Sequence, residues 1–335
     1  MKPNFKYDKV KIDYTKGYIS KGKNLKSSII KFKSLYKKPQ NGSEIVEIWN
    51  YEPRTDPVGS MIILHGLGTM NLKFLFWMAS HIASAGINSS VLILPGNYTR
   101  TANNSVSGKD YFATNIDKMM TYWENSIVDI LSTIDFLKQE NIWMKNNLVF
   151  GYCLGGMFSV LINALSEEIN QTLLMTVGGD IPKIFWESPI LKFARRDFSL
   201  GKGKEYYLND KEKLYSVYER DLEKVKNMNG INELFEADVH PLLKIEPLAF
   251  ANFLRHKKFT MIDALFDRAL PISCRKDLWI NLGKPSKKII PTGHISWLPF
   301  EYAIGKYILH LMGCLTPRRK RLLRERIALE EEILK

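Results

Sequence analysis

The sequence predicts an α/β protein built on a mostly parallel, doubly wound sheet. Short continuous apolar runs, typical of buried parallel strands, alternate with segments whose apolar residues recur at helical spacing. The runs end in glycine- or proline-containing turns, as after Leu64 and Leu94. This alternation is typical of βαβ units, in which helices connect parallel strands. The 335 residues suffice for one large domain or two small ones, and 45 % hydrophobic residues suffice for a sizeable core.

The first fifty residues follow a different pattern, because their hydrophobicity has a period of two. Residues 7–14 alternate apolar and polar side chains, and residues 28–33 and 44–49 do so in a similar way. Such alternation predicts half-exposed strands. We therefore expect antiparallel strands at one edge of the sheet.

The parallel part follows in chain order. The expected strands are 61–64, 90–94, 148–152, 171–177, 258–265 and 287–290, and the expected helices are 75–82, 113–139, 154–165, 271–282 and 298–312. Residues 180–256 interrupt this rhythm with charged and aromatic residues, so we expect a mainly helical cap there. The predicted organisation is a core of residues 1–179 and 257–315, a cap of 180–256 and a basic helical tail of 316–335.

The formal charge of +13 is concentrated at the two ends of the chain. Residues 1–42 contain twelve Lys but only Asp8 and Asp13, and residues 316–335 carry a net charge of +3, which leaves the stretch between them formally neutral. We expect no nucleic-acid partner, because no recognised fold or aromatic stripe accompanies the charge. The tail is expected to pack on its own domain or to pair two copies as a homodimer, with an anionic membrane surface as the alternative.

Cysteine and histidine usage indicates neither a disulfide framework nor a metal site. Cys153, Cys274 and Cys314 are odd in number and lack zinc-ligand spacing, and the six His are scattered. The N-terminus shows no signal-peptide pattern, and no apolar run approaches the ~20 residues of a membrane span. We expect a cytoplasmic protein with free thiols that needs no metal and no organic cofactor.

One hexapeptide, from Gly151 to Gly156, stands at a predicted strand-to-helix turn. Its sequence is Gly-Tyr-Cys-Leu-Gly-Gly, with Cys153 at the centre. A nucleophile elbow occupies this context, and its tight turn leaves room only for glycine at flanking positions, here Gly151, Gly155 and Gly156. The turn holds the central side chain out at a helix N-terminus, where the dipole favours the thiolate form of a cysteine.

An elbow requires an oxyanion loop before it and an acid and a histidine after it. Gly66 and Leu67 follow the strand 61–64, and the N–H groups of Leu67 and Leu154 are the expected oxyanion donors. His65, next to them, is interpreted as a loop-shaping residue rather than a base. Asp267 follows strand 258–265 and is preferred over Asp263, which falls inside that strand. His294 follows the last predicted strand, which completes the order nucleophile, acid, histidine.

On these residues, the chain resembles the α/β-hydrolase superfamily over roughly residues 45–313. The hexapeptide Gly-Tyr-Cys-Leu-Gly-Gly is similar to the elbow of dienelactone hydrolases and to the cysteine-bearing lipase box of polyhydroxyalkanoate synthases. The resemblance implies an α/β-hydrolase fold with acid and base loops around Asp267 and His294. The chain is longer than dienelactone hydrolases and has a cap that they lack.

A thiol nucleophile narrows the expected chemistry. Because a thiolate is also a good leaving group, it turns over best with activated substrates such as thioesters and enol esters. We expect a hydrolase that cleaves an activated ester or thioester of a small-molecule acyl substrate through an acyl-enzyme. An acyltransferase of polyester-synthase type and an inactive ligand-binding protein are the alternatives. Five cap aromatics either line an acyl pocket or simply pack: Trp186, Phe193, Phe198, Tyr206 and Tyr207.

Overall fold

The computed structural model describes residues 1–103, 105–297 and 300–314. The predicted tail 316–335, with its expected dimer or membrane contacts, lies outside these residues, as does the beginning of the predicted helix 298–312. Within the described parts, no helix is both long and apolar enough to cross a bilayer.

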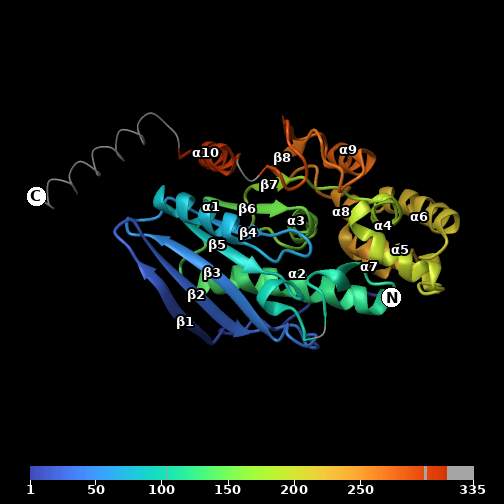
Figure 1. Ribbon diagram of the computed structural model, residues 1–335, viewed down its shortest axis with the longest axis horizontal. Helices are drawn as coiled ribbons and strands as arrows, with labels where there is room; N and C mark the ends of the chain where they lie inside the picture. The colour runs from blue at the N-terminus through green and yellow to red at the C-terminus, as the bar shows by residue number, and fades with distance from the viewer. Residues whose placement is uncertain (104, 298–299, 315–335) are drawn as a thin grey trace, which may run out of the picture.

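The described residues form a nine-stranded sheet with the order β1-β2-β3-β5-β4-β6-β7-β8-β9 (Figure 1). The β1, β2, β3 and β5 strands pair antiparallel, and all pairs from β5 to β9 are parallel. The predicted mostly parallel sheet with antiparallel edge strands is therefore confirmed. The strands are β1 (Tyr14–Lys21), β2 (Leu25–Lys33), β3 (Ile45–Pro53), β4 (Gly59–Leu64), β5 (Ile87–Ile93), β6 (Asn147–Tyr152), β7 (Thr172–Met175), β8 (Phe259–Ala264) and β9 (Ser286–Ile290).

Helices cover both faces of this sheet. The α1 and α10 helices share one apolar cluster with the first face, whereas α2, α3 and α9 share a second cluster with the other. These helices are α1 (Lys73–Ser84), α2 (Ile116–Gln139), α3 (Leu154–Leu165), α9 (Ile272–Asn281) and α10 (Glu301–Leu311). Strands buried on both sides account for the continuous apolar runs of the sequence.

The expected strand at residues 7–14 is wrong. The β1 strand begins only at Tyr14, and the chain before it runs along α2, where the Ile12 N–H donates to Gln139 Oε1 at 2.8 Å. The segment continues to the cap, beside which the N-terminus lies (Figure 1). Phe5 packs edge-on against Phe235 with ring centroids 5.4 Å apart. Extended chain lying on a helix buries alternate side chains just as a strand does, so the period of two misled the prediction.

Residues between β7 and β8 form a group of short helices at one end of the sheet (Figure 1). They are α4 (Ile181–Glu187), α5 (Lys192–Ser199), α6 (Lys211–Lys226), α7 (Ile231–Glu236) and α8 (Pro247–Ala251), with 3-10 turns between some of them. The segment agrees in position with the expected helical cap, whose exact boundaries stay a prediction. Buried Glu246, late in this segment, contacts its beginning. The Glu246 carboxylate accepts hydrogen bonds from the N–H groups of Asp180 and Ile181 at 2.8 and 2.7 Å.

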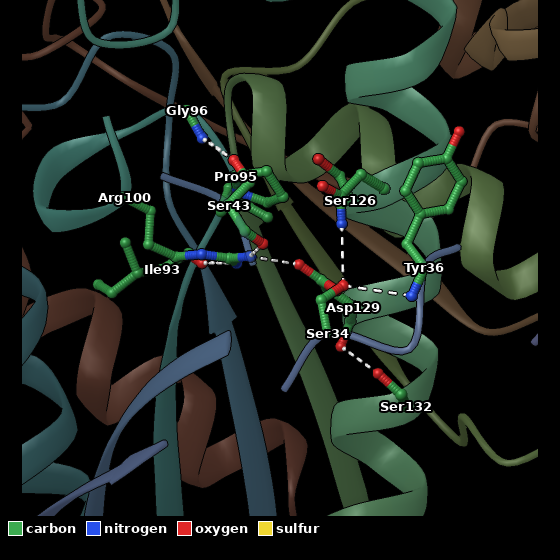
Figure 2. Close-up of polar contacts among 12 residues, drawn as sticks. Ser34, Tyr36, Ser43, Ile93, Pro95, Gly96, Arg100, Ser126, Asp129 and Ser132 are labelled. Atoms are coloured by element: carbon green, nitrogen blue, oxygen red, sulfur yellow. Dashed lines mark hydrogen bonds and ion pairs between the residues drawn. The ribbon is translucent and has the colours of Figure 1, made fainter. Parts of the chain in front are cut away.

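A buried ion pair holds the loop after β5 against α2. Arg100 Nη2 lies 2.7 Å from Asp129 Oδ2, and the two side chains are only 3 % and 0 % exposed (Figure 2). The guanidinium also donates to the carbonyl oxygens of Ile93 and Ser43, at 2.8 and 2.7 Å, and the Ser34 hydroxyl donates to Asp129 Oδ1 at 2.5 Å. Burial raises the pKa of Asp129, which Arg100 and Ser34 partly offset. The ion pair and its hydrogen bonds thus connect the end of β5, the loop after it, the chain between β2 and β3, and α2.

Replacement of Asp129 by Asn is expected to lower the free energy of unfolding by about 3–5 kcal/mol, because it leaves the Arg100 guanidinium buried without a counter-charge. Urea unfolding followed by tryptophan fluorescence measures the loss. The control is Glu168→Gln, which breaks a surface ion pair with Lys138. The side chains of Glu168 and Lys138 are 49 % and 42 % exposed, so the expected loss of unfolding free energy is below about 1 kcal/mol. Equal small losses in both variants would contradict the role given to the buried pair.

Candidate active site

The turn between β6 and α3 places Cys153 in a strained backbone conformation. Cys153 has a φ of 51° and a ψ of −115°, a region that residues other than glycine rarely occupy. The surrounding main chain holds it there, since the Cys153 N–H donates to Met175 O at 3.0 Å and its carbonyl accepts from Gly156 and Met157. The side chain therefore stands at the carboxyl end of β6 and at the N-terminus of α3.

The glycines of the turn are required by close backbone packing. A Cβ on Gly151 would lie 2.6 Å from both the Gly155 oxygen and the Gly156 Cα. On Gly155 it would overlap the carbonyl of Leu64 at the end of β4, and on Gly156 it would overlap the Val177 side chain. No real Cβ atom tolerates such contacts, so the predicted need for glycine at these three positions has a direct steric cause.

His294 and Asp267 meet at the carboxyl ends of β9 and β8. His294 Nδ1 lies 2.8 Å from Asp267 Oδ2, and the other carboxylate oxygen accepts the N–H groups of Ala269 and Leu270 at 2.8 and 3.1 Å. Burial alone would raise the pKa of Asp267, but His294 and the two N–H groups outweigh it and lower the pKa. The carboxylate is thus held ionised against the imidazole.

Asp263, the alternative acid, points elsewhere. Its carboxylate forms ion pairs with Arg275 and with Lys287, the latter at 2.9 Å. Both partners are cations of the neighbouring α9 and β9. Asp263 therefore neutralises buried charge within the sheet, and Asp267 is the carboxylate that reaches the histidine.

Cys153 and His294 line the same pocket. Burial lowers the pKa of His294, but the negative charge and hydrogen bond of Cys153, together with Asp267, outweigh this effect and raise the pKa to about 10. The sulfur and the Asp267 carboxylate thus both favour the protonated imidazole. The structure brings Cys153 together with Asp267 and His294, both of which lie more than a hundred residues further along the chain.

Tyr152 and Trp297 support the histidine, and sequence reasoning missed both. The Tyr152 hydroxyl donates to the His294 carbonyl oxygen at 3.2 Å, and its ring centroid lies 5.5 Å from the imidazole and 5.2 Å from Trp297. The same ring fills the space above Gly66, where a Cβ would come within 2.8 Å of it. The only available signal was the position of Tyr152 directly before the nucleophile.

His65 shapes the loop that follows β4. It is fully buried, its Nδ1 lies 2.8 Å from the Gly66 oxygen, and its Nε2 accepts the Leu94 N–H at 3.0 Å. Burial lowers the pKa of His65 to about 4, so the ring is neutral at physiological pH. With both ring nitrogens engaged in main-chain hydrogen bonds, His65 serves the loop and is no candidate for a base.

Two N–H groups near Cys153 make no hydrogen bond within the described residues, that of Leu67 in the loop after β4 and that of Leu154 at the start of α3. The next N–H, that of Gly68, is already bound to Asn97 Oδ1 at 3.0 Å. Both predicted oxyanion donors are therefore available to a ligand, whereas Gly68 anchors the loop.

A pocket of about 620 Å³ opens onto Cys153 and His294. Phe193 is the only one of the five predicted cap aromatics among its lining residues. Trp186 and Phe198 stack on each other at 5.4 Å, Tyr206 packs against His240, and Tyr207 lies under the Lys213 ammonium. The lining consists of Gly66, Leu67, Gly68, Thr69, Met70, Asn71, Phe74, Val106, Ser107, Gly108, Lys109, Tyr152, Cys153, Ile190, Phe193, His294 and Ile295.

Comparison with known proteins agrees with this architecture. The model of the dienelactone hydrolase family matches residues 47–176, a range that contains both the loop after β4 and the turn at Cys153. No curated protein sequence matches significantly.

Similar solved structures include two acetyl xylan esterases, one from Thermoanaerobacterium sp. JW/SL YS485 and one from Paenibacillus sp. R4. The first is 14 % identical with a TM-score of 0.59 over 92 % of this chain and 89 % of its own, and the second is 13 % identical with a TM-score of 0.60 over 89 % of both. The acylaminoacyl peptidase of Pyrococcus horikoshii is 14 % identical with a TM-score of 0.56. This match covers 87 % of this chain and 42 % of the peptidase. The fold, the turn at Cys153 and the family match together identify the chain as a hydrolase of the α/β-hydrolase superfamily.

Proposed function

We propose that the protein hydrolyses an activated ester or thioester through a covalent acyl-enzyme on Cys153. The observation that carries this proposal is the placement of the Cys153 thiol at a helix N-terminus, in one pocket with a His294 ring that Asp267 holds in turn. A nucleophile beside a base that a third group orients is the arrangement required for acyl transfer to the enzyme. The dienelactone hydrolase match and the esterase neighbours support hydrolysis of an ester bond.

In the first half of the proposed reaction, the Cys153 thiolate attacks the acyl carbon. The carbonyl oxygen becomes an oxyanion, to which the N–H groups of Leu67 and Leu154 can donate. Since Nδ1 of His294 binds Asp267, the proton on Nε2 is the one that passes to the departing alkoxide or thiolate. The bond to the leaving group breaks, and the acyl group remains on sulfur as a thioester.

In the second half, water replaces the leaving group. Neutral His294 takes one proton from water, and the hydroxide formed adds to the thioester carbon. Collapse of this second oxyanion breaks the carbon–sulfur bond, releases the carboxylic acid and restores the thiolate beside protonated His294. Asp267 keeps its hydrogen bond to Nδ1 throughout, and all protons are accounted for without another co-reactant.

The thiol favours substrates with a good leaving group. From the first tetrahedral intermediate, Cys153 and the substrate's leaving group compete for expulsion. An ordinary alkoxide loses this competition, whereas a thiolate or an enolate competes well. Activated esters and thioesters are therefore the proposed substrate class.

His294 is expected to titrate near pH 10, because Cys153 and Asp267 beside it outweigh burial and raise its pKa. Cys153→Ser removes the negative sulfur, so the pKa of His294 should fall toward the ordinary histidine value of ~6.5. NMR of protein labelled with ¹³C-histidine measures both titrations, and the signal is assigned by its absence in His294→Gln. A wild-type titration near pH 6.5 that Cys153→Ser leaves unchanged would contradict the pairing.

Limiting iodoacetamide at pH 7 is expected to alkylate Cys153 at least tenfold faster than Cys274, which is buried and whose pKa burial raises. Peptide mapping by mass spectrometry gives the rate at each cysteine. His294→Ala should slow the labelling of Cys153 by a similar factor, because it removes the cation beside the sulfur. The control is His81→Ala on the exposed face of α1, which should leave the rate unchanged.

The products formed from an acyl-thioester, with and without added alcohol, separate hydrolysis from the alternatives. Free acid as the main product under both conditions supports the proposal. A new ester as the main product would replace it with an acyltransferase. Slow, equal labelling of all the cysteines with no product would indicate a ligand-binding protein and contradict the proposal.

A further inference from the structure

The pocket in front of Cys153 is built mainly from apolar side chains. Large apolar residues come from the loop after β4, from α1, from the loop before α2, from the cap and from the histidine loop: Leu67, Met70, Phe74, Val106, Ile190, Phe193 and Ile295. No Asp or Glu is among the lining residues. Lys109 is the one lining residue with a permanent charge, and it is exposed on the surface side. The hydroxyls of Thr69 and Ser107, which also line the pocket, donate to the carbonyl oxygens of Gly66 and Thr69. The walls thus offer a ligand mainly apolar contact.

Several of these apolar side chains are strongly exposed in the free protein. Met70 is 80 % exposed, Ile295 67 %, Val106 65 % and Ile190 43 %. Single exposed apolar residues are common, but four that line one pocket form a patch of the kind that binds a ligand. A ligand that extends from the thiol toward the surface would cover them.

We infer that the acyl group is a neutral, apolar chain of more than four carbons, and that Ile190 and Phe193 of the cap set the preference for its length. This inference rests on the proposed function, since it places the acyl carbon at Cys153. An acetyl group would leave most of the 620 Å³ filled with water against apolar walls. A longer chain replaces that water and gains the hydrophobic free energy of each buried methylene.

Chain length is therefore the variable to test. In p-nitrophenyl esters from acetyl to octanoyl, which share one leaving group, kcat/KM is expected to rise about fourfold per methylene, the equivalent of ~0.8 kcal/mol, until the pocket is full. A value of kcat/KM that stays constant or falls from acetyl to octanoyl would overturn the inference.

Two cap variants and a matched control test which residues determine the preference for acyl-chain length. Phe193→Ala and Ile190→Asn should each reduce the octanoyl-to-acetyl ratio of kcat/KM about tenfold. Leu200→Asn is the control, because Leu200 is an apolar cap residue, 68 % exposed, that does not line the pocket. An equal effect of all three variants would assign the loss to the cap's stability and overturn the role of Ile190 and Phe193.

A binding measurement separates this inference from the proposed function. In Cys153→Ala, calorimetry with 2-butanone, 2-hexanone and 2-octanone should show affinity rising with chain length, and Phe193→Ala in that background should abolish the rise. If affinity rises with length but Cys153 fails to react, the pocket's preference stands and the catalytic proposal fails. If Cys153 reacts and affinity does not depend on length, the catalytic proposal stands and this inference fails.

Discussion

The close approach of the turn at Cys153 to the end of β4 is the constraint on which the site depends. The Gly155 N–H donates to the His65 oxygen at 3.0 Å, and no Cβ fits between Gly155 and the Leu64 carbonyl. This contact fixes the strained backbone of Cys153 and brings the loop with Leu67 beside it. The thiol and both free N–H groups are thus positioned by main-chain packing in the rigid centre of the sheet rather than by flexible side chains.

Buried polar contacts extend this rigidity outward. His65 connects the loop after β4 to Leu94, Asn97 holds the N–H of Gly68, and Arg100 of the same segment is fixed to Asp129 in α2 (Figure 2). Each link is a hydrogen bond made inside the protein, where an unpaired polar group would be costly. The loop that presents the Leu67 N–H is therefore preorganised for the charge that develops during the proposed reaction.

Local sequence features predicted most of the core but not its long-range packing. The parallel strands were predictable from continuous apolar runs, and the position of Cys153 from nearby glycines such as Gly156. Both signals lie in short stretches of contiguous sequence. The extended segment that contains Ile12 was misread as a strand, because alternation does not reveal what the chain packs against. The contact of Tyr152 with His294 and the choice of Phe193 among the cap aromatics depend on how distant segments fold together, for which no local pattern exists.

Capture of the covalent intermediate tests the central claim most directly. The protein is mixed with an acyl-thioester, quenched in acid within milliseconds to seconds, and analysed by intact mass and peptide mapping. The account predicts one added acyl mass, carried by Cys153, which forms and decays at rates compatible with turnover and is absent in Cys153→Ala. Turnover without any acyl group on Cys153, or with the acyl group on another residue, would contradict the account.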